Sequence, residues 1–378
     1  MGTDLEKQKN TEVFKLAPVD IDHLFRRSGL NGNQLSPFQY NAEQAAISSP
    51  SEFFKVLTES SRFNQVARCL LEPDIKIEFN RGGAGTADEA YYVLLSRPDQ
   101  AAAALLVNAE GDFLVLLFDD WAAYLQWWSP IYVSSGLSSY QAVFPQVMET
   151  EVLICALHCI DIYRRSYMES MLEYSGDLNL SITTQDFVDL LKRALASQDR
   201  RWLLPTLFEL TPGLKNSSLA LKPEHIKQLE QFDFAADNEG ILTLGERARI
   251  IGTEFITSWM GGLGFQATTL IKGEERSLSR VFLAATAFTN HLISFENEAS
   301  GKTNFRHQAL NEEELKQTLE KWMEALQKAV GGLAAAKTAE PDPLATSENA
   351  GSKMKFCGQC GAQLRPGKKF CGQCGVAL

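Results

Sequence analysis

The sequence predicts an α+β protein with a pseudo-duplicated body of antiparallel meanders and packed helices, followed by a small cysteine-rich module at the C-terminus. Three observations support this prediction. Segments with helical apolar spacing enclose segments in which the spacing changes to every second residue. The order helix, meander, helix occurs twice, in possible halves 12–178 and 179–330. Two CxxC pairs close the chain.

Composition and charge limit the class of protein. Of the 378 residues, 45% are hydrophobic and 22% are charged, as in a globular protein that is soluble. No apolar run approaches the ~18 residues that a membrane helix needs, and the polar residues 1–11, expected to be disordered, do not resemble a secretory signal. We therefore expect a cytoplasmic protein without membrane insertion.

The first half is predicted to begin with a short strand at 13–16 and a helix at 20–29. A second helix follows Ser51 and ends at Pro73. Alternating residues then predict a meander of about four strands between 75 and 118. Asp119 and Asp120 are expected to cap the next helix, which outweighs an acid–base role for this pair.

Residues 149–174 predict one long helix, on which Cys155, His158 and Cys159 share a face. The spacing i, i+3, i+4 suits a metal or thiol site, but the surrounding helix is apolar. We therefore favour core packing for these three residues and also for Cys69.

The second half is predicted to start near Leu180, where Thr183 to Asp186 would cap a helix. Further helices are expected from Trp202 to Leu210 and from Pro223 through Leu229. Apolar runs then predict strands at 232–234, 250–259, 265–271 and 291–295. A last amphipathic helix should follow Asn311 and stop at Gly331-Gly332. Residues 331–352 are expected to form a flexible linker.

The C-terminal motif consists of Cys357-Gly-Gln-Cys360-Gly and Cys371-Gly-Gln-Cys374-Gly, with ten residues between the pairs. Four thiolates at this spacing suit one tetrahedral Zn²⁺, and a closed Cys₄ set leaves no position for a catalytic water. The alternatives are a pair of disulfides or a redox CxxC. The duplicated pattern and the three additional cysteines favour structural zinc.

Residues 356–378 resemble the short bacterial zinc-ribbon tail domain, which implies that 353–378 folds around its metal. This segment contains Lys353, Lys355, Arg365, Lys368 and Lys369 and no acid, so its charge is +5. Because the whole chain carries −11, residues 1–352 carry −16. Nucleic-acid contact is therefore expected only through the tail.

Motifs for common enzymes are missing from the sequence. GxSxG, HExxH and GxGxxG do not occur, and the glycine run 82–85 lacks the GK[ST] ending of a phosphate loop. Gly301-Lys302-Thr303 mimics such an ending, but Glu296 stands where the loop requires glycine. We name no catalytic residue and expect a non-enzymatic protein. An enzyme whose active site is assembled from scattered residues of the body is the alternative.

The order of elements in the body resembles that of EspG-type chaperones of ESX (type VII) secretion. The resemblance lies in the capped helix 20–29, the helix that ends at Leu71-Glu72-Pro73, the meander to Phe118 and the closing helix 312–330. It implies a cytoplasmic chaperone that grips helical-hairpin secretion substrates. We therefore expect a protein-binding adaptor or chaperone with a structural zinc-ribbon tail.

Overall fold

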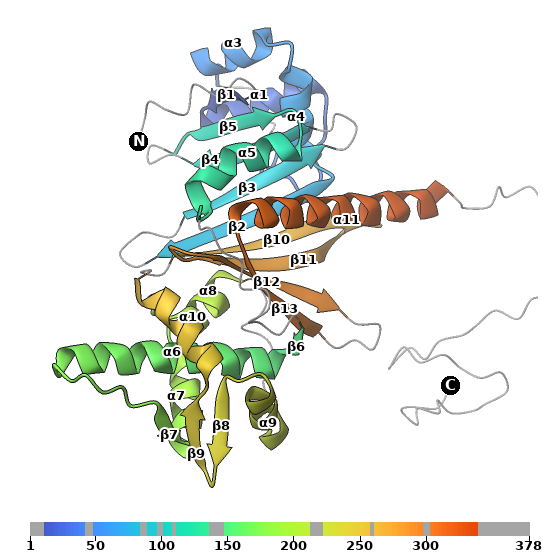
Figure 1. The fold of residues 1–378 in the computed structure, drawn as a ribbon. Coiled ribbons are helices and arrows are strands. Elements are labelled where there is room, and N and C mark those ends of the chain that lie inside the picture. Colours follow the sequence, from blue (N-terminus) through green and yellow to red (C-terminus); the bar gives the residue numbers. More distant parts are fainter. Residues whose placement is uncertain are drawn as a thin grey trace, which may run out of the picture. The chain divides into compact units, whose positions relative to one another are not determined.

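The computed structural model describes residues 11–41, 48–83, 89–96, 101–107, 111–135, 147–211, 222–257, 261–297 and 303–338. Met1–Leu333 and Ala334–Leu378 are separate compact units, and the first contains every strand of the described ranges (Figure 1). None of the helices in these ranges is both apolar and long enough for a membrane span.

The first part of the chain builds one half of a large sheet. Its elements are β1 (Thr11–Leu16), α1 (Pro18–Ser28), α3 (Glu52–Glu59), α4 (Phe63–Leu71), β2 (Ile75–Gly83), β3 (Glu89–Ser96), β4 (Ala101–Val107), β5 (Phe113–Phe118) and α5 (Trp121–Tyr132). Strands β2 to β5 are the predicted meander, and β1 pairs with β5 at its outer side.

The second part repeats this plan with a larger insertion. Its elements are β6 (Met148–Glu149), α6 (Thr150–Leu172), β7 (Ser181–Thr183), α7 (Thr184–Ala196), α8 (Leu203–Leu210), α9 (Pro223–Gln231), β8 (Ala235–Asn238), β9 (Ile241–Leu244), α10 (Glu246–Thr257), β10 (Gly261–Ile271), β11 (Glu274–Ala285), β12 (Asn290–Asn297), β13 (Thr303–Leu310) and α11 (Glu312–Thr338). Strands β10 to β13 form the second meander, and β6 pairs with β13.

The two meanders join into one sheet, which has ten strands among the described residues, in the order β1-β5-β4-β3-β2-β10-β11-β12-β13-β6. The halves meet where β2 and β10 pair antiparallel. Phe79 lies opposite Phe265 there, and their rings stack with centroids 5.1 Å apart. The predicted pseudo-duplicated α+β body is confirmed. The topological repeat begins at Met148, however, and not near Leu180, so α6 belongs to the second half.

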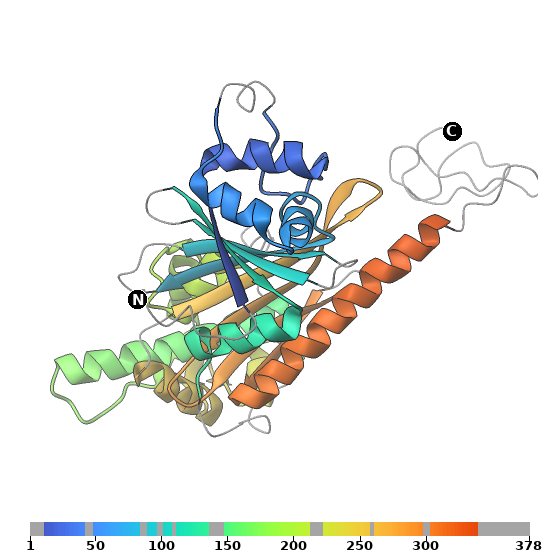
Figure 2. The ribbon, with the colours of Figure 1, turned by 90° about the horizontal axis from the view of Figure 1, so that it is seen from above.

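Helices cover both faces of the sheet because adjacent strand residues point to opposite sides. On β11, Val281 and Leu283 pack with α5 and α11, whereas Phe282 and Ala284 pack with the α6–α10 group. In the first half, α1, α3 and α4 cover the face opposite α5. Figure 2 shows α5 and α11 together on one side of the sheet and α1, α3 and α4 on the other.

Several predicted elements differ from those observed. The run 250–259, predicted as a strand, lies largely in α10, where Ala248, Ile251 and Phe255 are buried at helical spacing. Residues 232–234 end α9 in a turn, and the strand starts at Ala235. The helix predicted after Ser51 is interrupted at 60–62 and continues as α4. Strands β11 and β13 were not predicted.

The last helix passes through Gly331-Gly332 and ends at Thr338, so the first part of the predicted linker is helical. Asp120 caps α5 as expected, since its Oδ1 accepts the Ala123 N–H at 2.8 Å. Asp119 pairs instead with Arg62 at 2.8 Å. Both glycine motifs lie partly outside the described residues: 84–85 of the glycine run 82–85, and 301–302 of the Gly301-Lys302-Thr303 motif.

Candidate binding groove

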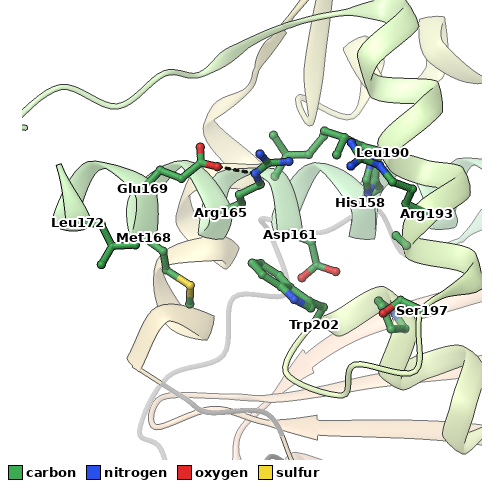
Figure 3. Close-up of a pocket in the computed structure, with 13 residues that line it drawn as sticks. His158, Asp161, Arg165, Met168, Glu169, Leu172, Leu190, Arg193, Ser197 and Trp202 are labelled. Atoms are coloured by element: carbon green, nitrogen blue, oxygen red, sulfur yellow. Dashed lines mark hydrogen bonds and ion pairs between the residues drawn. The ribbon is translucent and has the colours of Figure 1, made fainter.

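A cavity of about 470 Å³ lies between α6, α7 and the start of α8 (Figure 3). It falls within the ~300–1,000 Å³ range typical of ligand pockets. Its lining comes from three helices and the segment between two of them: His158, Asp161, Ile162, Arg165, Met168, Glu169, Leu172, Leu190, Arg193, Ala194, Ser197, Trp202 and Pro205.

The lining residues follow helical spacing on two walls. On α6 they extend from His158 to Leu172, about 21 Å at 1.5 Å per residue. On α7 they are Leu190, Arg193 and Ala194, followed by the C-cap residue Ser197, again three and four residues apart. Such stripes are the faces that helices present to one another. The cavity is therefore an elongated groove along the seam between α6 and α7, with Trp202 and Pro205 at the start of α8 completing its lining.

The groove has an apolar wall and a charged rim. Ile162, Met168, Leu190 and Trp202 line it, together with other apolar side chains, while the rim holds the exposed Arg165–Glu169 pair at 2.6 Å. Apolar side chains are also exposed at and next to the end of the groove, where Met171, Leu172 and Tyr174 are 63%, 79% and 97% exposed. Exposed apolar residues that continue a groove are characteristic of protein interaction sites.

One wall is anchored by a buried ion pair. Arg164 donates to Asp161 Oδ1 at 3.0 Å and to the Arg201 carbonyl at 2.9 Å. Asp161 also accepts the backbone N–H groups of Leu203 and Leu204 at 2.9 Å each, so it caps α8 from another helix. Burial raises the pKa of Asp161, and Arg164 and these N–H groups oppose that rise. With its oxygens thus occupied, Asp161 holds α8 against α6.

His158 lies at the inner end of the groove and is uncharged near neutral pH. Burial lowers its pKa to about 4. Its Nε2 lies 3.3 Å from the Phe187 carbonyl, which only accepts, so Nε2 carries the proton. Burial also raises the pKa of Cys155 to about 12 and that of Cys159 well above its usual value. Core packing, as predicted for this trio and for the buried Cys69, is confirmed.

A second buried cluster was not predicted. Glu254 Oε2 lies 3.1 Å from His291 Nε2, and His291 Nδ1 lies 3.2 Å from His307 Nε2. Thr286 donates its hydroxyl to the same Glu254 oxygen at 2.9 Å. Burial and the neighbouring His291 hold the pKa of His307 well below its usual value. The three residues come from α10, β12 and β13, so no local sequence pattern joins them. Glu254, His291 and His307 are each at most 5% exposed, so this cluster belongs to the interior of the body.

Within the described residues, one His–carboxylate group has the spacing of metal ligands: Glu149, Glu151 and His225. Its hydrogen bonding does not favour a metal. His225 Nδ1 accepts the Lys222 N–H at 3.1 Å, so the neutral ring carries its proton on Nε2, toward Glu149 at 3.9 Å. A histidine binds a metal through one ring nitrogen that has a free lone pair, while the other nitrogen carries the proton. Here the Lys222 N–H occupies the Nδ1 lone pair, and Nε2 carries the proton. This group is better explained as a helix cap beside a carboxylate.

The predicted zinc ligands Cys357, Cys360, Cys371 and Cys374 lie outside the described residues. No protein-family model matches the chain, and no curated protein matches its sequence. The groove between α6 and α7 is the candidate functional site of the body. Sequence patterns placed both helices correctly but could not show that they leave a seam open.

Proposed function

We propose that the protein is a non-enzymatic adaptor or chaperone, and that the groove between α6 and α7 binds the apolar face of a helix from a partner protein. The observation that carries the proposal is the pair of open helical stripes, which offer a third helix the surface that helices normally bury. The exposed Met171 and Leu172 extend the apolar surface along α6.

The rim charges supply direction and specificity. Arg165, Glu169 and Arg193 offer both signs of charge along the groove, so a partner helix with complementary side chains would bind in one orientation. The resemblance to EspG-type chaperones implies helical-hairpin substrates. A hairpin would place one helix in the seam and leave the other for the exposed end of α6. On this proposal the protein works in the cytoplasm.

For the tail we propose one structural Zn²⁺ held by Cys357, Cys360, Cys371 and Cys374, supported by their spacing. A module of this size depends on its metal for folding. The tail would provide a second contact with the partner. Its +5 charge also favours the alternative of nucleic-acid contact, which predicts salt-dependent retention on nucleic acid that disappears when 353–378 is deleted.

The helix-binding proposal is tested with a labelled amphipathic peptide about five helical turns long, with Leu on one face and Gln and Ser elsewhere. An uncharged peptide avoids attraction to the acidic body. We expect saturable binding to the full chain, measured by fluorescence anisotropy. Leu190→Glu and Met168→Glu should each weaken it at least about tenfold, because they place a charge on the apolar wall.

Val56→Glu is the matched control, since Val56 is 65% exposed on α3, away from the groove. It should leave the affinity unchanged. A second peptide of equal composition, with its Leu residues spread around the helix, should bind poorly. Equal binding of both peptides, or an unchanged affinity in Leu190→Glu, would refute the proposal.

A further inference from the structure

The stripe of α6 that lines the groove has a pattern that reads the same in both directions. Its members Ile162, Arg165, Glu169 and Leu172 are spaced by three, four and three residues along the helix. Residues with this spacing form a continuous seam, as they do in coiled coils. The chemistry is symmetric as well, because two apolar residues enclose one cation and one anion. An antiparallel copy of the stripe therefore presents complementary side chains to it.

The charges decide the direction of this match. In an antiparallel pair centred between Arg165 and Glu169, each arginine lies opposite the glutamate of the other copy, and each Ile162 lies opposite a Leu172. A two-fold axis produces such reciprocal contacts. A parallel pair in register would instead place like charges opposite each other. The stripe is therefore neutral and self-complementary, on a body whose residues 1–352 carry −16 and otherwise repel a second copy.

The same residues are accessible to another molecule. The side chains of Arg165 and Glu169 are 47% and 53% exposed, and Leu172 is more exposed still. Figure 3 shows Arg165, Glu169 and Leu172 following one another along the groove. In Figures 1 and 2 the C-terminal end of α6 projects beyond the neighbouring elements. A second copy can therefore lie along this end of the helix.

We propose that two copies of the chain pair through antiparallel α6 helices, and that each α6 occupies the groove of the other copy. Arg165 and Glu169 then form ion pairs across the two-fold axis, and Leu172 of each copy packs on Ile162 of the other. This inference shares with the proposed function the premise that the groove accepts a helix. It adds a means of regulation, because the homodimer closes the groove until a partner helix displaces the second copy.

Exchanging the charges of the full chain tests the pairing. Sedimentation equilibrium over a concentration series should show a monomer–dimer equilibrium for the wild type. Arg165→Glu and Glu169→Arg should each weaken self-association at least about tenfold, because like charges then face each other across the axis. An equal mixture of these two variants should form a heterodimer, since every facing pair again has opposite signs. The double variant Arg165→Glu, Glu169→Arg should dimerise like the wild type.

Lys192→Glu is the matched control. It makes the same change of charge on the exposed side of α7, outside the groove, and should leave self-association within about twofold of wild type. Thermal unfolding of each variant checks that the body remains folded. A wild type that stays monomeric throughout the series would overturn the inference. A mixture of the two single variants that does not associate would overturn it as well.

Competition separates this inference from the proposed function. The uncharged amphipathic peptide should convert the dimer to monomers as it fills the groove. If a wild type that is always monomeric binds the peptide, the second copy is refuted and the helix-binding proposal stands. A dimer that persists with the peptide bound would also overturn the inference. A dimer that obeys the charge exchange in a protein that does not bind the peptide would support the inference and refute the helix-binding proposal.

Discussion

Burial sets the chemistry of the ionisable side chains along α6. His158 is 3% exposed and Cys159 is fully buried, so the uncharged forms are favoured in both. Asp161 is also buried, but a guanidinium and two N–H groups surround it. The same helix therefore contains a buried histidine without a charged partner and a buried carboxyl group whose raised pKa is opposed by Arg164 and two N–H groups, and these two residues make different predictions.

The depressed pKa of His158 makes stability depend on pH. Its pKa is about 4 in the folded chain and about 6.5 when unfolded, so the unfolded chain binds the proton more readily between these values. The contribution of neutral His158 to the unfolding free energy is therefore fully present above pH 6.5, and it is lost as the pH falls toward 4. His307 is shifted in the same direction and adds to the loss.

We expect His158 to account for about 2 kcal/mol of the decrease in unfolding free energy between pH 7.5 and pH 5. Urea unfolding at both pH values measures this decrease. His158→Gln, which does not titrate, should show a shallower pH dependence by that amount. The same slope in wild type and variant would show that His158 is not protonated on unfolding in this range.

Asp161→Asn tests the buried anchor. The substitution leaves the buried Arg164 without its anionic partner, and breaking such a pair costs about 3–5 kcal/mol. Denaturant unfolding at pH 7 measures the loss. Asp189→Asn is the control, because Asp189 pairs with Lys192 on the exposed side of α7. Its effect should be small compared with that of Asp161→Asn, because an exposed ion pair contributes little to stability.

At the scale of elements, α8 lies close against the central strand β10. A Cβ placed on Gly264 would lie 1.7 Å from the Leu210 carbonyl oxygen, which is backbone and cannot rotate away. Gly264→Ala therefore forces α8 off the sheet, and we expect it to destabilise the fold by about 3 kcal/mol or more. Thermal unfolding measures this change. Gly176→Ala, with no heavy atom within 4 Å, should be nearly neutral.

Sequence patterns predicted most elements because their local signals were unambiguous. Thr183 caps α7 and accepts the Asp186 N–H at 3.1 Å, as its position indicated. The strand predicted at 250–259 was wrong. Its isoleucines, Ile250, Ile251 and Ile256, favour strands by local propensity, but only a helix buries Ala248, Ile251 and Phe255 on one side. Strand β11 was missed because its first part is charged and exposed.

The candidate groove could be predicted only in part. Helices α6 and α7 and the buried face of Cys155, His158 and Cys159 follow from spacing alone. The contact of Asp161 with Leu203 and Leu204 spans about forty residues and depends on how α8 packs, which no local pattern contains. The pairing of Glu254 with His291 is non-local for the same reason.

At the scale of the whole molecule, two repeats share one sheet through β2 and β10, and the second repeat carries a long insertion between α6 and β10. The insertion supplies α7 and α8, which complete the groove. The first repeat has α3 and α4 at the corresponding place in the chain order. The repeat explains the sheet, and the insertion accounts for the proposed binding surface.

The metal content distinguishes the two candidate metal sites of the chain. If the four C-terminal cysteines hold zinc, the purified full chain carries one Zn²⁺, and Cys371→Ser with Cys374→Ser removes it. His225→Ala should leave the zinc content unchanged, because the Lys222 N–H already occupies His225 Nδ1. Mass spectrometry of the bound metal measures the zinc content of the wild type, the cysteine variant and His225→Ala. Zinc lost in His225→Ala and kept in the cysteine variant would assign the metal to the body.

Thiol titration provides an independent count of the same site. The chain has seven cysteines, of which Cys69, Cys155 and Cys159 are buried. We expect Ellman's reagent to react slowly with the native chain, with four thiols after chelation and with all seven in guanidinium chloride, since buried and zinc-bound sulfurs are both protected. Four thiols reactive without a chelator would show that the tail binds no metal. If no further thiols became reactive after the chelator is added, the four cysteines would be paired in disulfides instead.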